Sequence, residues 1–205
     1  MPLNANVKTE VIKNTEKFEG RVPHLYLDTR GLVTVGIGHL ISNKAAMASV
    51  VMYKKNSNNT LVLASLAEKQ AEYDLIKKQP YGFSRNANFY KLHTTLIMKD
   101  HDIVAQKEKH ILKFYSELTK YYTTSNGFAK NFDLMPYSVQ KALFDMVFNL
   151  GITKLRTQYV KMNNAIKKED WIVAAAESKR VGISSSRNNY VSNLFLSAQK
   201  QSITP

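Results

Sequence analysis

The chain contains no cysteine. Disulfides and thiolate metal sites are therefore excluded, and the fold does not depend on redox conditions. No apolar run approaches the roughly 20 residues of a membrane span. The start of the chain, Met1–Asn6, has no basic segment followed by an apolar core, so we expect neither a transmembrane segment nor a secretory signal.

Acidic residues are few: 16 against 29 basic ones, which gives a net charge of +13. Such an excess favours polyanions, for example nucleic acid, anionic membrane surfaces or bacterial cell-wall polymers, although solubility alone could account for it. The basic residues are spread along the chain without a nucleic-acid-binding signature, so no specific nucleic-acid partner is expected. The five histidines show no metal-ligand spacing, and we predict neither a metal nor another cofactor.

The stretch from Phe18 to Leu40 carries the most information. A helical pattern of apolar residues begins at Val7 and stops at Gly20, a residue typical of the position after a helix. This pattern places Glu19 in the last helical turn. The negative end of the helix dipole disfavours a carboxylate there, so this carboxyl group can stay protonated.

A hairpin is predicted next, with strands Leu25–Asp28 and Leu32–Gly38. Asp28 and Gly31 occupy the first and fourth positions of a type I turn, and Thr34 lies on the returning strand. A protonated carboxyl, a second carboxylate and a hydroxyl around one cleft suit glycoside hydrolysis. The alternative is purely structural, with a turn-forming aspartate and a threonine chosen for its β propensity.

The residues of this stretch resemble the phage-type lysozymes, the T-even endolysin family (glycoside hydrolase family 24). The matching positions are Glu19, Asp28, Thr34, Gly36, Gly38 and His39. Two later stretches match in the right order: Phe144–Gly151, and Lys167–Trp171 with the alanines that follow. The segment from Ser42 to Thr95 does not match and reads as an insertion within a single domain of residues 1–205.

The resemblance implies a mainly α, lysozyme-like α+β fold with two lobes: a small β-hairpin lobe and a helical lobe joined by a long helix. It also implies a muramidase that cleaves the β-1,4 bond between N-acetylmuramic acid and N-acetylglucosamine in bacterial peptidoglycan. By analogy Glu19 is the general acid, and Asp28 with Thr34 holds the attacking water in an inverting mechanism.

The resemblance further implies substrate contacts and two supporting residues. The substrate contacts are Gly38, Leu40, Phe148 and Asn149. Arg187 is expected to reach back to the catalytic glutamate, with a solvated surface charge as the alternative. His39 is expected to be structural, paired with a carboxylate for which Glu108 is the candidate.

Periodicity predicts the remaining elements. In the insertion we expect a helix over Leu40–Tyr53, a polar loop over Lys54–Thr60 and a helix over Leu61–Lys78. The aromatic loop Gln79–Asn88 can stack on sugar rings or pin itself to a core. Further on, a strongly apolar helix is closed by Gly151, and Trp171 is a packing anchor.

Two other functional classes stay open: a catalytically weak wall-binding module and a basic nucleic-acid binder. For the hydrolase, the biological role is either phage endolysin or secreted antibacterial effector. Either acts in the periplasm or cell wall of a target bacterium and is carried there by other machinery. An immunity or delivery protein is then a further candidate partner.

Overall fold

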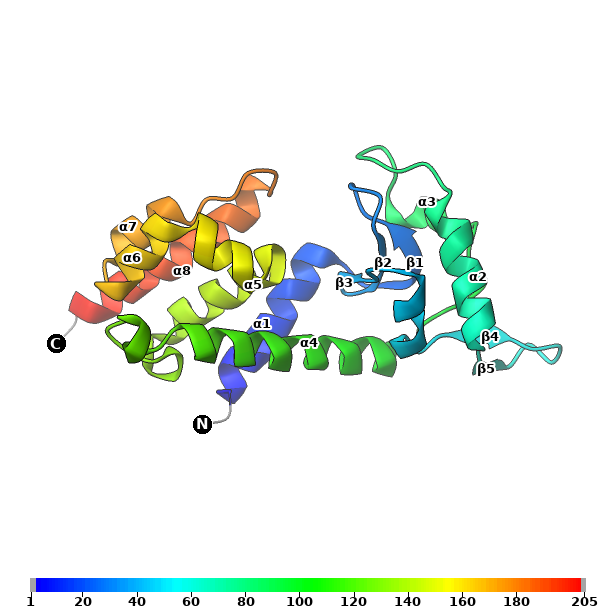
Figure 1. The fold of residues 1–205 in the computed structure, drawn as a ribbon, viewed down its shortest axis with the longest axis horizontal. Helices are drawn as coiled ribbons and strands as arrows, with labels where there is room; N and C mark the ends of the chain where they lie inside the picture. Colours follow the sequence, from blue (N-terminus) through cyan, green and yellow to red (C-terminus); the bar gives the residue numbers. More distant parts are fainter. Residues whose placement is uncertain (1–2, 204–205) are drawn as a thin grey trace. The chain divides into compact units, whose positions relative to one another are not determined.

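The computed structural model describes residues 3–203 and is mainly helical with small antiparallel sheets (Figure 1). This confirms the predicted fold class. The chain divides into two compact units, one of residues 19–109 and one that combines the described residues up to 18 with those from 110 onward. Within the described residues, no helix is both long and apolar enough to cross a bilayer.

The 19–109 unit is built on a three-stranded antiparallel sheet. Its strands are β1 (Val22–Leu27), β2 (Val33–Gly36) and β3 (His39–Leu40), in the order β1-β2-β3. The strands begin and end within a few residues of the predicted hairpin. The chain reverses from β2 to β3 through two left-handed glycines, Gly36 at φ +67° and Gly38 at φ +64°.

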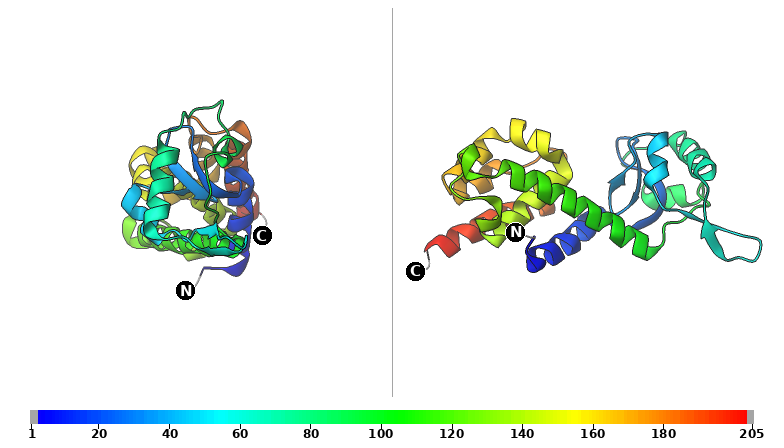
Figure 2. Two further views of the ribbon diagram at one scale, coloured as in Figure 1. Left: turned by 90° about the vertical axis from the view of Figure 1, so that its right-hand side faces the viewer. Right: turned by 60° about the horizontal axis from the view of Figure 1, so that its bottom comes forward.

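The insertion forms further elements of the same unit. These are the 3₁₀ helix η1 (Lys44–Ser49), strands β4 (Tyr53–Lys55) and β5 (Leu61–Leu63), and helices α2 (Leu66–Lys77) and α3 (Ala87–Lys91). Strands β4 and β5 form a hairpin whose loop extends away from the rest of the unit (Figure 2). Helices α2 and α3 both pack against β1.

Three predicted boundaries in the insertion are wrong. The expected helix over Leu40–Tyr53 is instead a strand end and a 3₁₀ helix, which begins where the Asn43 side chain accepts a hydrogen bond from the Ala46 amide at 3.0 Å. Strand β4 takes up the start of the predicted Lys54–Thr60 loop, and strand β5 takes up the first residues of the predicted Leu61–Lys78 helix. Helix α2 starts later because Ser65 and Glu68 form a capping box.

Each unit has its own hydrophobic core. In the 19–109 unit, side chains from one face of the sheet meet those of η1 and α2, and the buried members include Leu25, Leu27, Val33, Val35, Met47, Met52 and Ile76. Because side chains alternate along a strand, the intervening residues of β1 and β2 lie on the opposite face. That second face carries the residues on which the candidate site depends.

The other unit is helical. Its elements are α1 (Ala5–Glu19), most of α4 (Asp100–Tyr121), α5 (Tyr137–Gln158), α6 (Val160–Lys167), α7 (Trp171–Glu177) and α8 (Ser185–Ile203), with the short 3₁₀ helices η2 (Thr124–Asn126) and η3 (Phe132–Leu134). Gly151, expected to close this helix, instead interrupts α5 with a kink at φ +74° and ψ 158°, and α5 continues to Gln158. Trp171 is 1% exposed, which confirms its packing role.

Candidate functional site

Glu19 stands where the sequence predicts, as the last residue of α1. Gly20 follows at φ +73° and ends the helix in a left-handed conformation that suits glycine. The glutamate side chain lies against Gly38, because a Cβ atom added to that glycine would stand 3.0 Å from Glu19 Oε2. The glycine-rich reversal between β2 and β3 therefore leaves the space that the Glu19 carboxyl group occupies.

Asp28 begins the predicted turn. The Gly31 amide donates to the Asp28 carbonyl oxygen at 2.9 Å, which closes the turn. The side-chain Oδ1 accepts hydrogen bonds from the amides of Arg30 and Leu32, both at 2.9 Å. Oδ2 lies 3.6 Å from Arg30 Nε. The carboxylate is thus oriented by its own turn, which is the structural role considered for Asp28, and its chemical role stays a prediction.

Thr34 lies in the middle of β2, between two neighbours on the same face of the sheet. It pairs with Tyr26 on β1 and with Leu40 on β3. Directly opposite residues of antiparallel strands project to the same face, so these three side chains share one face of the sheet. The Thr34 hydroxyl donates to the Leu32 carbonyl oxygen at 3.1 Å, which leaves its lone pairs as acceptors.

Tyr26 connects the residues of this site, although the sequence assigned it no role. Burial raises the pKa of its phenol strongly, and the negative charges of Glu19 and Asp28 raise it further. Glu19 and Asp28 therefore both lie near the Tyr26 hydroxyl group, which stays neutral and stands across the strand pair from Thr34. The available signal was strand period: Tyr26 comes two residues before Asp28, at the spacing of neighbours on one face.

Two further predicted residues, His39 and Leu40, form β3 beside this site. Burial lowers the pKa of the His39 imidazole, which favours its neutral form and fits a structural histidine. Leu40 is 46% exposed, so it offers apolar surface next to Thr34. The pairing of His39 with Glu108 stays a prediction.

Phe148, Asn149 and Arg187 belong to the other unit. Phe148 stacks edge-on with Phe114, with ring centroids 5.7 Å apart. Arg187 is 6% exposed, which rules out the solvated surface charge considered as its alternative. Its Nε lies 3.0 Å from Asp145 Oδ2. The expected roles of these three residues toward the substrate and Glu19 stay predictions.

Asp145 also binds a second arginine that the sequence did not single out. Arg180 Nη1 donates to Asp145 Oδ1 at 2.6 Å, and the Arg180 side chain is 1% exposed. One carboxylate thus holds two buried guanidinium groups, an arrangement that is stable only when all three groups are well hydrogen-bonded. This network fixes the start of α8 on α5 and thereby positions Arg187.

The described residues contain no group of three or more histidine, aspartate or glutamate side chains placed to share a metal ion. The candidate site around the hairpin offers the carboxyl groups of Glu19 and Asp28, the phenol of Tyr26 and the hydroxyl group of Thr34. Such groups can donate a proton, accept a proton and hold a water molecule. Comparison of the sequence with protein-family models and with curated proteins finds no match for this chain.

Proposed function

We propose that the chain is a peptidoglycan hydrolase, an inverting muramidase. The observation that carries the proposal is the placement of the polar groups around the hairpin. The Glu19 side chain lies against Gly38, the Asp28 carboxylate is oriented by its turn, and Thr34 pairs with Tyr26 across the sheet. These residues come from a helix end, a turn and a strand. Their sequence spacing is the one that resembles phage-type lysozymes.

In the proposed reaction, the Glu19 carboxyl group donates its proton to the glycosidic oxygen as the bond to the leaving sugar breaks. A water molecule held by Thr34 attacks the anomeric carbon from the opposite face, and Asp28 accepts its proton. The hydrogen bonds from the Arg30 and Leu32 amides keep the Asp28 carboxylate oriented for this task. The anomeric centre is inverted because the water attacks once, without a covalent intermediate.

The test is the release of reducing muramic-acid ends from purified peptidoglycan. Glu19→Gln keeps the size of the side chain but cannot supply the proton, so the rate should fall by about 10²–10⁴-fold. Glu16→Gln, which removes a carboxylate one turn earlier in α1, is the matched control and should cleave like the wild type. Equal rates for Glu19→Gln and the wild type would refute the assignment of Glu19 as the general acid.

The alternative of a catalytically weak wall-binding module makes a different prediction. It would sediment with insoluble peptidoglycan and release no new ends, with or without Glu19. The net charge of +13 supports wall binding under either function, since cell-wall polymers are anionic. We further propose that the enzyme acts in the periplasm or cell wall as an endolysin or antibacterial effector, with a delivery or immunity protein as a partner.

A further inference from the structure

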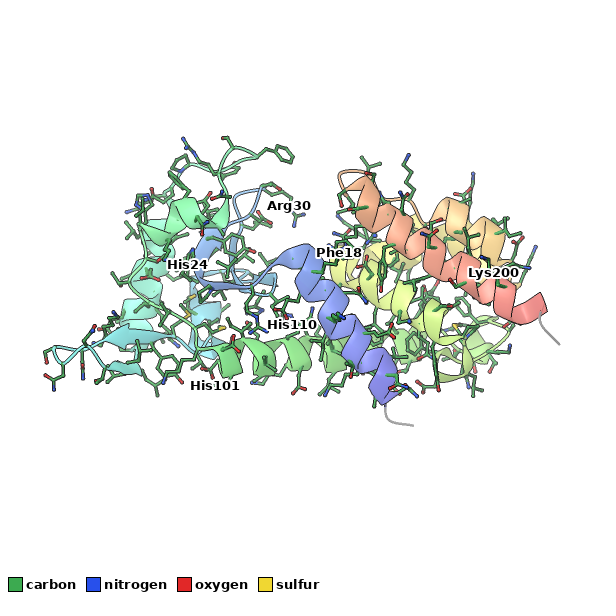
Figure 3. The ribbon with its side chains drawn as sticks, turned by 180° about the vertical axis from the view of Figure 1, so that it is seen from behind. Phe18, His24, Arg30, His101, His110 and Lys200 are labelled. Carbon is green, nitrogen blue, oxygen red and sulfur yellow. The ribbon has the colours of Figure 1, made fainter. Side chains whose placement is uncertain are left out.

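The insertion touches the turn that orients Asp28. A Cβ atom added to Gly31 would lie 2.8–2.9 Å from three ring atoms of Tyr81, so the tyrosine ring rests directly on the glycine backbone. Lys77, at the end of α2, donates from Nζ to the Gly31 carbonyl oxygen at 2.6 Å. The aromatic loop is therefore seated on the hairpin, and a side chain at residue 31 would displace it. Figure 3 labels Arg30 at the tip of this turn.

The loop is also anchored at its base. Tyr90 is fully buried, and its hydroxyl group donates to the Pro80 carbonyl oxygen at 2.9 Å. On the far side, the Arg85 guanidinium lies over the Phe89 ring, 4.6 Å from its centroid. Both ends of the segment between α2 and α3 are thus held by contacts inside the 19–109 unit.

The part between these anchors presents aromatic surface. The Tyr81 side chain is 59% exposed although its ring covers Gly31, and Phe83 is 97% exposed. A single exposed aromatic residue is ordinary on a protein surface. Two of them in a loop seated on the turn of a candidate catalytic residue are a different case. Phe83 buries almost nothing, so folding does not explain it.

We propose that Tyr81 and Phe83 form a sugar-binding platform at the Asp28 end of the site, on which one saccharide unit of the glycan strand stacks. The inference rests on the function proposed above and names a subsite for it. A pyranose ring has a face of C–H groups that can cover an aromatic ring and remove apolar surface from water. The tyrosine hydroxyl group can also hydrogen-bond to the sugar.

The platform predicts a dependence on substrate length. A strand long enough to reach the loop gains the stacking contact, whereas a short oligosaccharide that spans only the cleaved bond does not. Loss of one ring face from such a contact is expected to lower affinity about tenfold. Phe83→Ala should therefore raise KM on long, uncrosslinked glycan strands and lower the ratio of kcat/KM for long over short substrates about tenfold.

Three further variants complete the experiment. Tyr81→Ala should lower the same ratio, while Tyr81→Phe keeps the ring and should retain most of it. Leu92→Ala is the matched control: Leu92 is 88% exposed in the same unit but lies outside the loop, and the ratio should not change. The midpoint of thermal unfolding of each variant shows whether the packing of the loop on Gly31 has been lost. Phe83→Ala tests the platform without removing the contact between Tyr81 and Gly31.

Failure of the platform and failure of the function have different signatures. A wild-type protein that releases no reducing ends from any substrate refutes the proposed function. A wild-type protein that cleaves, together with a long-to-short ratio that Phe83→Ala and Tyr81→Ala leave unchanged, refutes the platform alone. Sedimentation of the Glu19→Gln protein with insoluble glycan, with and without Phe83→Ala, measures the same contact without cleavage and should show about tenfold weaker binding for the double variant.

Discussion

Gly38→Ala should damage catalysis by moving an atom of the proposed acid. The added methyl group would stand 3.0 Å from Glu19 Oε2, 3.3 Å from Cγ and 3.4 Å from Cδ. These separations are shorter than the roughly 3.5–4.0 Å at which non-bonded carbon atoms pack. The glutamate side chain must therefore shift by several tenths of an ångström or change rotamer.

The substitution also carries a backbone penalty. Gly38 has φ +64°, and a left-handed conformation disfavours a residue with a Cβ atom by about 1–2 kcal/mol. Gly182→Ala is the matched control for this term, because Gly182 has φ +78° and an added Cβ atom would meet nothing within 4 Å. Both variants should lose a similar free energy of unfolding, measured in urea. A difference in cleavage rate between the two variants therefore reports the contact with Glu19 and not the backbone penalty.

The assay is the initial rate of release of reducing ends at a temperature where both variants are folded. A displacement of about 1 Å in a catalytic group can lower a rate about 10²-fold, so we expect Gly38→Ala to be about tenfold slower than Gly182→Ala. If the two variants cleave at the same rate, the reasoning is refuted, because the Glu19 carboxyl group then does not need the position that Gly38 leaves open.

Two further predictions concern the product of the reaction and the buried carboxyl group of Glu72 on α2. The first product released should be the α-anomer in proton NMR before mutarotation, and a β-anomer would mean that Asp28 attacks directly and Thr34 holds no water. Glu72 accepts hydrogen bonds from the amides of Thr95 at 2.6 Å and Leu96 at 2.9 Å, yet burial raises the pKa of its carboxyl group. The folded state then holds this proton more tightly than the unfolded chain. The free energy of unfolding of the wild type should therefore fall relative to that of Glu72→Gln as pH rises above the unfolded carboxyl pKa of about 4. Urea-unfolding profiles that stay parallel would contradict this.

Local rules account for the parts of the fold that were predicted. Gly20 ends α1, Gly31 completes the Asp28 turn and Gly151 interrupts α5, and each adopts a positive φ that glycine tolerates. The apolar stripe of α5 follows from helical periodicity. In each case the deciding contacts lie within a few residues in the sequence.

The elements that were missed depend on distant partners. Tyr53 exchanges backbone hydrogen bonds with Ile97 at 2.7 and 2.9 Å, and β4 pairs with β5 across a polar loop. Propensity in a short apolar run cannot foresee such pairings, because strand formation is decided by the neighbouring strand. The place of Tyr26 also depends on strand pairing. It lies opposite Thr34 only because the register of β1 and β2 shifts between Val22 and Tyr26, and the sequence alone does not reveal that shift.

The insertion contributes to the proposed site through the turn of Asp28, the proposed general base. Asp28 is oriented by the amides of Arg30 and Leu32. Gly31, which lies between them, is held by Lys77 through its carbonyl oxygen and by Tyr81 across its α-carbon. Cutting out the whole loop would therefore disturb the Asp28 turn and the sugar platform together. The single substitution Phe83→Ala separates the two effects, because it leaves the contacts of Lys77 and Tyr81 with Gly31 in place.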